Sequence, residues 1–411
     1  MLKYVKLTFL VWLIHNDLLI LPLQIDKQIH SLKKQRILSV DIFRGLTIAF
    51  MILVNNPGTW SRIYPPLEHA AWHGITPTDL IFPFFLFIVG TSIVLAYNKK
   101  RSYVNHHLYK KIIIRSLKII LIGLFLAGFT YHFPFFKNLS ELRLPGVLQR
   151  IGIVFLITAS FFVAVKNWKW YLLVLVLLLG GYWYAMTHVS IDGKPPQLTK
   201  SENLASVIDR KVLGEKHMWK HYEENGYVQG DYDPEGLFST LPAIGTTILG
   251  IFLGLILIDR RFSPYAKVIL FVFIGLLLFI LGLLWNESFP LNKRLWTSSY
   301  VLYTGGLAFL VFALVYLIVD IFNKQKWADV FKYLGMNAIA IFTLSGFIEK
   351  SFYLLHFPGS KRRIHSWLYH NLFVNPLGNS ELTSMLYAIS IVLFYIFVAW
   401  WLYRKKIFIK V

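Results

Sequence analysis

The stretches YLLVLVLLLGGYWYAM (171–186) and YAKVILFVFIGLLLFILGLLW (265–285) decide the fold class of this chain. Each is a long, nearly uninterrupted apolar block, whereas a soluble domain distributes its apolar residues in stripes. A helix rises about 1.5 Å per residue, so roughly 20 apolar residues cross the hydrocarbon core of a bilayer. The two blocks therefore predict α-helices that span a membrane.

The composition of the whole chain agrees with this prediction. Of its 411 residues, 56% are hydrophobic, and the mean hydropathy is +0.55. Phe, Trp and Tyr make up 17% and gather at the ends of the apolar blocks, as the aromatic belt of a membrane protein does. These features argue against a water-soluble globular protein.

Apolar blocks recur along the chain and predict an all-α, polytopic membrane protein with about ten transmembrane helices around a central cavity. The sequence does not decide whether there is an eleventh span, because the N-terminal apolar segments 7–14 and 18–23 are separated by His15, Asn16 and Asp17. The basic and apolar extension 1–36 fits an interfacial segment, a degenerate extra span or an over-extended start equally well. We expect the ten helices near residues 38–56, 79–97, 112–131, 145–166, 168–187, 237–258, 265–285, 297–319, 328–349 and 384–403.

The net charge of +21 does not indicate nucleic-acid binding. The basic residues lie in short loops between apolar blocks, as in NKKRSYVNHHLYKK (98–111), where they act as topology signals and contact lipid headgroups. This bias predicts that both termini are cytoplasmic. Within a single domain, 37–411, the loops 57–78, 188–236 and 350–383 then face the opposite side, where we expect the last two to cap an outward-facing cavity.

Charged residues inside the predicted spans need an explanation, because a charge in the membrane is costly. Asp41 and Arg44 stand one turn apart on one helix face, either as an ion pair that anchors the helix or with Arg44 facing an anionic ligand. Lys118 and Arg150 favour the second interpretation, since neither has an acidic partner in its own helix. A multiply phosphorylated ligand would explain several inward-facing cations.

The other end of the first span leads into a polar loop with His69, His73 and Asp79. Thr76, Thr78 and Asp79 have the chemistry of an N-cap for the second span, and capping alone would account for Asp79. If that carboxylate also orients His69, the histidine becomes a competent general base. The two histidines lack a third suitable ligand nearby, and the chain has no cysteine, so we expect no metal.

The length of the first span permits a specific ligand. Arg44 and Asn55 are eleven positions apart, or about 16 Å along a helix. An extended phosphopantetheine arm covers a comparable distance. A coenzyme-A thioester could therefore place its phosphates near the cytoplasmic cations and its acyl group near Asn55 and His69.

Six segments in order resemble the heparan-α-glucosaminide N-acetyltransferase family of membrane enzymes. The resemblance extends from about residue 37 to the C-terminus. The segments are VDIFRGLTIAFMILVNN (40–56), HAAWHGITPTDLIFPFFLFIVGTSI (69–93), LPGVLQRIG (144–152), DPEGLFSTLPAIGTTILGIFLG (233–254), PLNKRLWTSSYVL (290–302) and LGMNAIAIF (334–342).

The resemblance implies an acyltransferase that moves acetyl from cytoplasmic acetyl-CoA to the amine of a glucosamine-type sugar on the far side. His69 would be the catalytic histidine, acting as general base or transiently acetylated, with Asp79 orienting it and Asn55 polarising the carbonyl. Contacts to acetyl-CoA are expected from Arg44, Lys118, Arg150 and Asn337.

Because the sequence departs from the family at several positions, it does not decide which acceptor the protein uses. The stretch between Asn55 and His69 is about three residues longer than in lysosomal members, and His73 replaces an asparagine. O-acetylation of a surface glycan or lipid-linked sugar is one alternative. A secondary transporter of sugars or anions is another, although no internal repeat is visible. We expect a homodimer in membrane lipid, in a bacterial inner membrane, with no nucleic-acid partner.

Overall fold

The computed structural model of this chain describes residues 37–132, 135–223 and 226–409. Residues Leu38–Val411 form one compact unit. The extension 1–36, for which three interpretations were open, lies outside the described residues.

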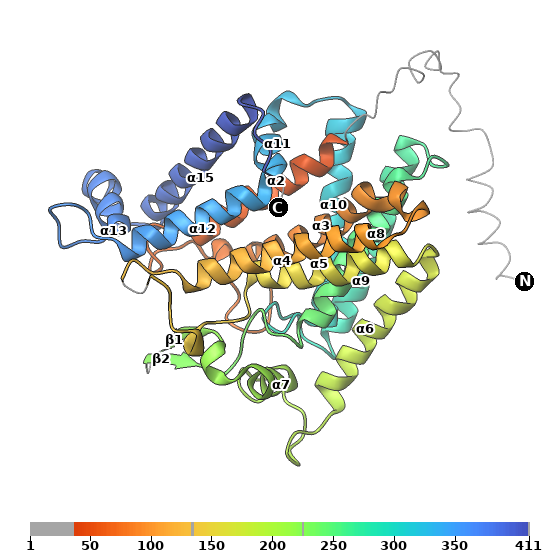
Figure 1. Cartoon of the computed structure of the whole chain (residues 1–411), viewed down its shortest axis with the longest axis horizontal. Coiled ribbons are helices and arrows are strands. Elements are labelled where there is room, and N and C mark those ends of the chain that lie inside the picture. The colour runs from red at the N-terminus through yellow and green to blue at the C-terminus, as the bar shows by residue number, and fades with distance from the viewer. Residues whose placement is uncertain (1–36, 133–134, 224–225, 410–411) are drawn as a thin grey trace, which may run out of the picture. The chain divides into compact units, whose positions relative to one another are not determined.

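Membrane-spanning helices dominate the described residues (Figure 1). Eight of them are long and apolar enough to cross a bilayer. A ninth span is formed if the helices Lys326–Met336 and Ala338–Leu354, which meet at a 73° bend, count as one. The eight are α2 (Leu38–Asn55), Pro77–Ser102 around α3 (Ile81–Tyr97), α5 (Val147–Ala164), α6 (Trp168–His188), α8 (Thr240–Ile258), α9 (Pro264–Asn286), Ser298–Ile321 around α10 (Ser298–Tyr316) and α15 (Glu381–Arg404).

The expected count of about ten spans is not confirmed. The difference arises at α4 (His106–Gly128), which is long enough to cross a bilayer but carries too many charged residues along its length to be counted with the other eight. Four cations stand along it, at Lys110, Lys111, Arg115 and Lys118. The expected helix 328–349 is broken at Asn337 between α11 (Asp329–Met336) and α12 (Ala338–Leu354).

The core lies between α3 and α8, which pack with their backbones in near contact. A Cβ added at Gly250 would meet the carbonyl oxygen of Phe87 at 1.8 Å, so only glycine fits. Thr91 Oγ1 donates to the Gly250 carbonyl at 3.0 Å across the same interface. Small residues permit this close approach of helices in membranes. By contrast, only 17% of the span Pro264–Asn286 is buried, so α9 presents most of its apolar surface outward, where lipid would lie.

The first span is fixed at its N-terminal end by other helices. Asp320, which follows α10, accepts hydrogen bonds from the backbone amides of Leu38 and Ser39 at 3.2 and 3.0 Å. These are amides that a helix N-terminus leaves without an intrahelical partner. Farther along α2, Gly45 packs directly against the backbone of α11, where a Cβ would meet the Phe331 carbonyl at 1.7 Å. The direction of α2 is thus set by its neighbours.

The insertion 188–236 carries secondary structure that the sequence pattern did not reveal. It contains α7 (Leu204–Leu213) and an antiparallel hairpin of β1 (Lys220–Glu223) and β2 (Gly226–Gln229). Figure 1 shows α7 and the hairpin outside the layer of long helices. The second insertion, 350–383, contains α13 (Ile364–Tyr369), a π-helical turn (His370–Val374) and α14 (Asn375–Leu377).

Candidate active site

A cavity of about 240 Å³ lies at the Asn55 end of α2, where the polar loops meet the helices. Six parts of the chain contribute its polar and aromatic walls: α2, the loop 56–76, the start of the span Pro77–Ser102, the insertion 188–236, the loop between α9 and α10, and α12. Residues far apart in the sequence therefore face one space. Its polar and aromatic lining consists of Asn55, His69, Thr78, Phe82, Trp219, Glu235, Lys293, Arg294 and Phe342.

His69 and Asp79 form a hydrogen-bonded pair on the wall of this cavity. His69 Nδ1 lies 2.7 Å from Asp79 Oδ1. The carboxylate is 1% exposed and the imidazole 40%, so Asp79 is enclosed while the ring reaches the open space. Because a carboxylate accepts, Nδ1 carries the proton, and Nε2 keeps its lone pair for an incoming proton.

The second oxygen of Asp79 holds the backbone in place. Oδ2 accepts from the amides of Ala70 and Thr76 at 3.1 and 3.0 Å, and Thr76 Oγ1 lies 3.1 Å from it. Thr76 and Asp79 form the capping box of the short helix Pro77–Leu80, which leads into α3. The predicted N-cap is therefore confirmed for Thr76 and Asp79, whereas the Thr78 hydroxyl donates to the Pro66 carbonyl instead. Capping and orientation of His69 are not alternatives here, since each uses a different carboxylate oxygen.

Local hydrogen bonds fold the loop 56–76 so that His69 comes back to the helix end. Thr76 Oγ1 donates to the Glu68 carbonyl at 2.6 Å, and Thr78 Oγ1 donates to the Pro66 carbonyl at 3.1 Å. The loop is also fastened to distant parts of the chain. Trp72 Nε1 donates to the Leu198 carbonyl at 2.7 Å, and Gly74 N donates to the Leu291 carbonyl at 2.8 Å.

Lys293 brings a positive charge directly to His69. Its Nζ lies 3.1 Å from Nε2 and 3.2 Å from Nδ1 of the imidazole. Burial lowers the pKa of His69 below its ordinary value, and Lys293 lowers it further, against the raising effect of Asp79. Burial also lowers the pKa of Lys293. The site therefore favours a neutral imidazole near neutral pH.

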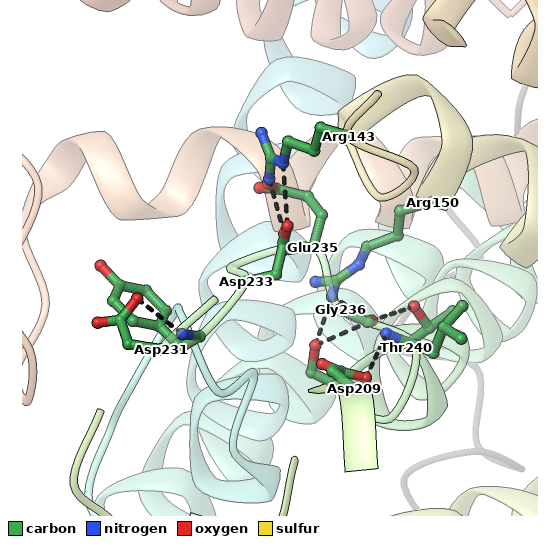
Figure 2. Close-up of polar contacts among 11 residues, drawn as sticks. Arg143, Arg150, Asp209, Asp231, Asp233, Glu235, Gly236 and Thr240 are labelled. Carbon is green, nitrogen blue, oxygen red and sulfur yellow. Dashed lines mark hydrogen bonds and ion pairs between the residues drawn. The ribbon is translucent and has the colours of Figure 1, made fainter. Parts of the chain in front are cut away.

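An ion cluster behind the cavity holds Glu235 in its wall (Figure 2). Arg143 donates to Glu235 Oε2 at 2.6 Å and to both oxygens of Asp233 at 2.7 and 2.9 Å. Burial acts to raise the pKa of Glu235, but Arg143 and the neighbouring cations together hold it below its ordinary value. Glu235 is thus an anion in a cavity that Lys293 and Arg294 also line.

Arg150 is buried beside the same cluster, 1% exposed. Its Nη2 donates to the Gly236 carbonyl at 3.0 Å and to Ser239 Oγ at 2.5 Å, and its guanidinium lies 5.1 Å from the centre of the Trp296 ring. Nε and Nη1 have no hydrogen-bond partner among the described residues. Because Val147, one turn away on α5, lines the cavity, Arg150 belongs to the His69 end of the molecule.

The other residues expected to contact a phosphorylated donor lie elsewhere. Arg44 Nη1 approaches Asp41 at 3.4 Å and donates to the Gly335 carbonyl at 3.2 Å, at the opposite end of α2. Asn337, two positions after Gly335, holds the C-terminal segment through Ile407 and Ile409. Lys118 is exposed on α4. The structure therefore brings Arg44 and Asn337 to one end, leaves Arg150 at the other, and does not bring Lys118 to either group.

The sequence reasoning missed Trp219, Glu235, Lys293 and Arg294 as site residues. Glu235, Lys293 and Arg294 stand inside segments that had been recognised, DPEGLFS (233–239) and PLNKRLW (290–296). The resemblance of these two segments to the family was the signal in the sequence that could have identified the three residues. His73 lies apart from the pair, with Asn292 Nδ2 donating to its Nδ1 at 3.4 Å. In the described part of the chain, no group of three or more His, Cys, Asp or Glu residues could hold a metal ion.

The sequence of the chain is similar to those of known proteins. The sequence model of a family described as heparan-alpha-glucosaminide N-acetyltransferase, catalytic, matches residues 36–282. The chain is 31% identical to the heparan-alpha-glucosaminide N-acetyltransferase of Homo sapiens, an alignment that covers 92% of this chain and 60% of that protein. The Mus musculus protein of the same name is 29% identical, with 95% and 63% covered. The chain thus spans about three fifths of the length of these relatives.

Proposed function

Because this chain belongs to the heparan-alpha-glucosaminide N-acetyltransferase family, we propose that it transfers acetyl from cytoplasmic acetyl-CoA to the amine of a glucosamine-type sugar on the opposite face of the membrane. The observation that carries this proposal is the His69–Asp79 pair, which opens onto a cavity at the end of a membrane-spanning helix. A neutral imidazole with a fixed tautomer is what an ammonium acceptor requires, since the amine must lose a proton to attack.

In the proposed direct reaction, His69 is the general base. The ammonium of the acceptor first releases one proton to solvent. The neutral amine then attacks the thioester carbonyl, and the new C–N bond forms while Nε2 takes a second proton from the nitrogen. The C–S bond breaks, and the thiolate of coenzyme A leaves with the proton that the imidazolium returns to it. Asp79 stabilises the transient imidazolium through its 2.7 Å contact with Nδ1.

The developing oxyanion needs hydrogen-bond donors at the same place. Asn55 lines the cavity from the last turn of α2, and Lys293 Nζ stands 3.1 Å from His69 Nε2. We assign the Asn55 amide to the carbonyl oxygen of the donor. The Lys293 ammonium is a second donor once the acceptor amine takes its place beside Nε2.

The acceptor side of the cavity suits an amino sugar. Trp219 offers an aromatic face that can pack against a sugar ring, and it stacks on His221 with ring centroids 4.6 Å apart. Glu235 is an anion that can hold the acceptor's ammonium or hydroxyl groups. Since the chain spans only part of its relatives, the acceptor is assigned from these residues and from the name of the family.

For the donor, we propose that the phosphates lie at the Arg44 end of α2 and the acetyl group at the Asn55 end. Arg44 and Asn337 would contact the phosphate end. Arg150 has two buried guanidinium nitrogens without partners among the described residues and would contact the donor near its reactive end. A contact from Lys118 requires that the donor also reach the exposed side of α4.

Purified protein in proteoliposomes tests the function. Acetyl-CoA is placed on one side and glucosamine on the other, and N-acetylglucosamine is measured on the glucosamine side. The variant His69→Ala should reduce turnover by about 10²- to 10⁴-fold, because the general base is lost. His73→Ala, four positions away in the same loop, is the matched control and should keep most of the activity.

Turnover in the His69→Ala variant at the wild-type rate would remove His69 from the mechanism. Glucosamine that crosses the bilayer unmodified would support a transporter instead. Radiolabelled acetyl-CoA without acceptor distinguishes direct transfer from a route through acetyl-His69, since only the second leaves label on the protein.

A further inference from the structure

A second cavity, of about 280 Å³, lies beside the reactive one and has no part in the proposed reaction. Its walls are almost wholly apolar and come from α2, the loop 56–76, the short helix Pro77–Leu80, the start of α3 and one residue of α10. Phe43 and Phe84 are stacked in one wall, with ring centroids 5.6 Å apart. A cavity of this volume and lining accepts a hydrocarbon chain rather than a sugar.

The apolar cavity adjoins the His69 cavity directly. Val54, Thr78 and Ile81 line both of them. Pro66 and Leu67, which stand three and two positions before His69, also line the apolar cavity. A molecule with its polar head beside His69 would therefore find an apolar space next to it, beneath the loop that carries the base.

The apolar cavity also reaches the surface that would face lipid. Phe50, on α2, is 50% exposed, and Val311, on α10, is 36% exposed, although both line the cavity. Both stand inside membrane-spanning segments. A chain could thus enter from the bilayer sideways, while its head stays at the level of the outer loops.

We propose that the acceptor of this protein is an amino sugar carried on a lipid, with its acyl or prenyl chain in this apolar cavity and its glucosamine ring beside His69. This inference rests on the proposed function and adds the substrate class. A free sugar would leave the second cavity without use, whereas a lipid-borne sugar uses both cavities at once. Anchoring of the chain would also raise the local concentration of the amine at the base.

Glucosaminides of increasing chain length test the proposal in the full-length protein. Methyl and hexyl glucosaminide, both soluble, are compared as acceptors with acetyl-CoA as donor. Burial of the added methylenes in an apolar space is favourable, and the gain grows with the length of the chain. We therefore expect hexyl glucosaminide to have a kcat/KM at least about tenfold higher than methyl glucosaminide even if the chain is only partly buried.

Two variants of α10 separate the cavity from general partition into the membrane. Val311→Trp fills the cavity, whereas Leu314→Trp, one turn later and 57% exposed, adds the same ring outside it. Val311→Trp should remove the advantage of the hexyl chain and leave turnover of methyl glucosaminide unchanged, which also shows that the variant is folded. Leu314→Trp should keep the advantage.

Equal loss or equal retention in both variants would overturn the proposal, because the chain would then act through the surrounding membrane and not through this cavity. The absence of any chain-length effect in the wild type would overturn it as well, even with full turnover of methyl glucosaminide. If the wild type acetylated neither glucosaminide nor free glucosamine, the proposed function itself would be wrong. The two failures are thus distinguishable.

Discussion

Asp79 shows how one side chain can serve both the fold and the site. Its Oδ2 accepts from the backbone amides of Ala70 and Thr76, and these two hydrogen bonds fix the orientation of the carboxylate. Its Oδ1 is left to His69 at 2.7 Å. The same carboxylate that caps the helix therefore orients the base. Because its position is fixed, it keeps the proton of His69 on Nδ1. This accounts for a buried acid at the beginning of a span, where a charge would otherwise be costly.

The charge of Lys293 should be visible in the pH dependence of the reaction. Since burial and this ammonium both lower the pKa of His69, the base is neutral, and the enzyme active, down to a pH below the ordinary histidine value. In Lys293→Met the pKa of His69 rises, so the acidic limb of kcat/KM moves to higher pH. The plateau should also fall, on the order of 100-fold, if Lys293 stabilises the oxyanion. The measurement is the pH–rate profile.

Lys293→Arg is the matched variant, because it keeps a cation in the same place. Its acidic limb should stay close to that of the wild type. An acidic limb that does not move in Lys293→Met would show that this ammonium does not act on the base.

Contacts in the site could be predicted from the sequence only between residues that are close together along the chain. His69 and Asp79 are separated by ten positions, and the capping pattern fixes Asp79, so their pairing could be inferred from local chemistry alone. Lys293 is 224 positions from His69. No periodicity or spacing connects them, because the two loops are brought together by the packing of α10 against α3 and by hydrogen bonds such as the one from Gly74 N to the Leu291 carbonyl.

At the scale of elements, close contact between α3 and α8 holds the site's scaffold together. Gly250→Ala places a methyl group 1.8 Å from the Phe87 carbonyl oxygen, which is backbone and cannot move without shifting a helix. We expect a loss of about 1–3 kcal/mol in stability, as for overpacking of a core. The measurement is the thermal unfolding midpoint in detergent. Gly181→Ala on α6 has nothing within 4 Å of its new methyl group and should leave the midpoint unchanged. Equal midpoints for the two variants would show that the interface relaxes.

The positions of the helices could be predicted where a helix is apolar on all sides. The prediction failed where a helix carries charges or is broken. Most spans were placed to within a few residues, because an apolar block of that length forms a membrane-spanning helix. Two positions differ for physical reasons. The cations of α4 set it apart from the other spans without shortening the helix. The chain bends by 73° at Asn337, whose side chain hydrogen-bonds to the backbone of Ile407 and Ile409. That tertiary contact has no local signature.

At the scale of the whole molecule, the proposed reaction needs a defined orientation in the membrane. Acetyl-CoA must reach the Arg44 end and the sugar the His69 end, so the loop 57–78 has to face away from the cytoplasm. The basic loop 98–111 marks the other side by the positive-inside rule. The fold makes the two loops ends of neighbouring spans, because α2 leads into the first, and α3 ends just before the second.

The chain contains no cysteine, which makes this orientation directly measurable. Trp60→Cys and Tyr103→Cys introduce single thiols at positions that are 60% and 82% exposed, one in each loop. In intact cells a membrane-impermeant maleimide should label Trp60→Cys and leave Tyr103→Cys unlabelled until the membrane is permeabilised. The unsubstituted chain, which has no thiol, is the negative control and should not be labelled. Labelling of Tyr103→Cys alone from outside would invert the topology and place the acetyl-transfer cavity on the side of acetyl-CoA synthesis, where no transfer across the membrane would be needed.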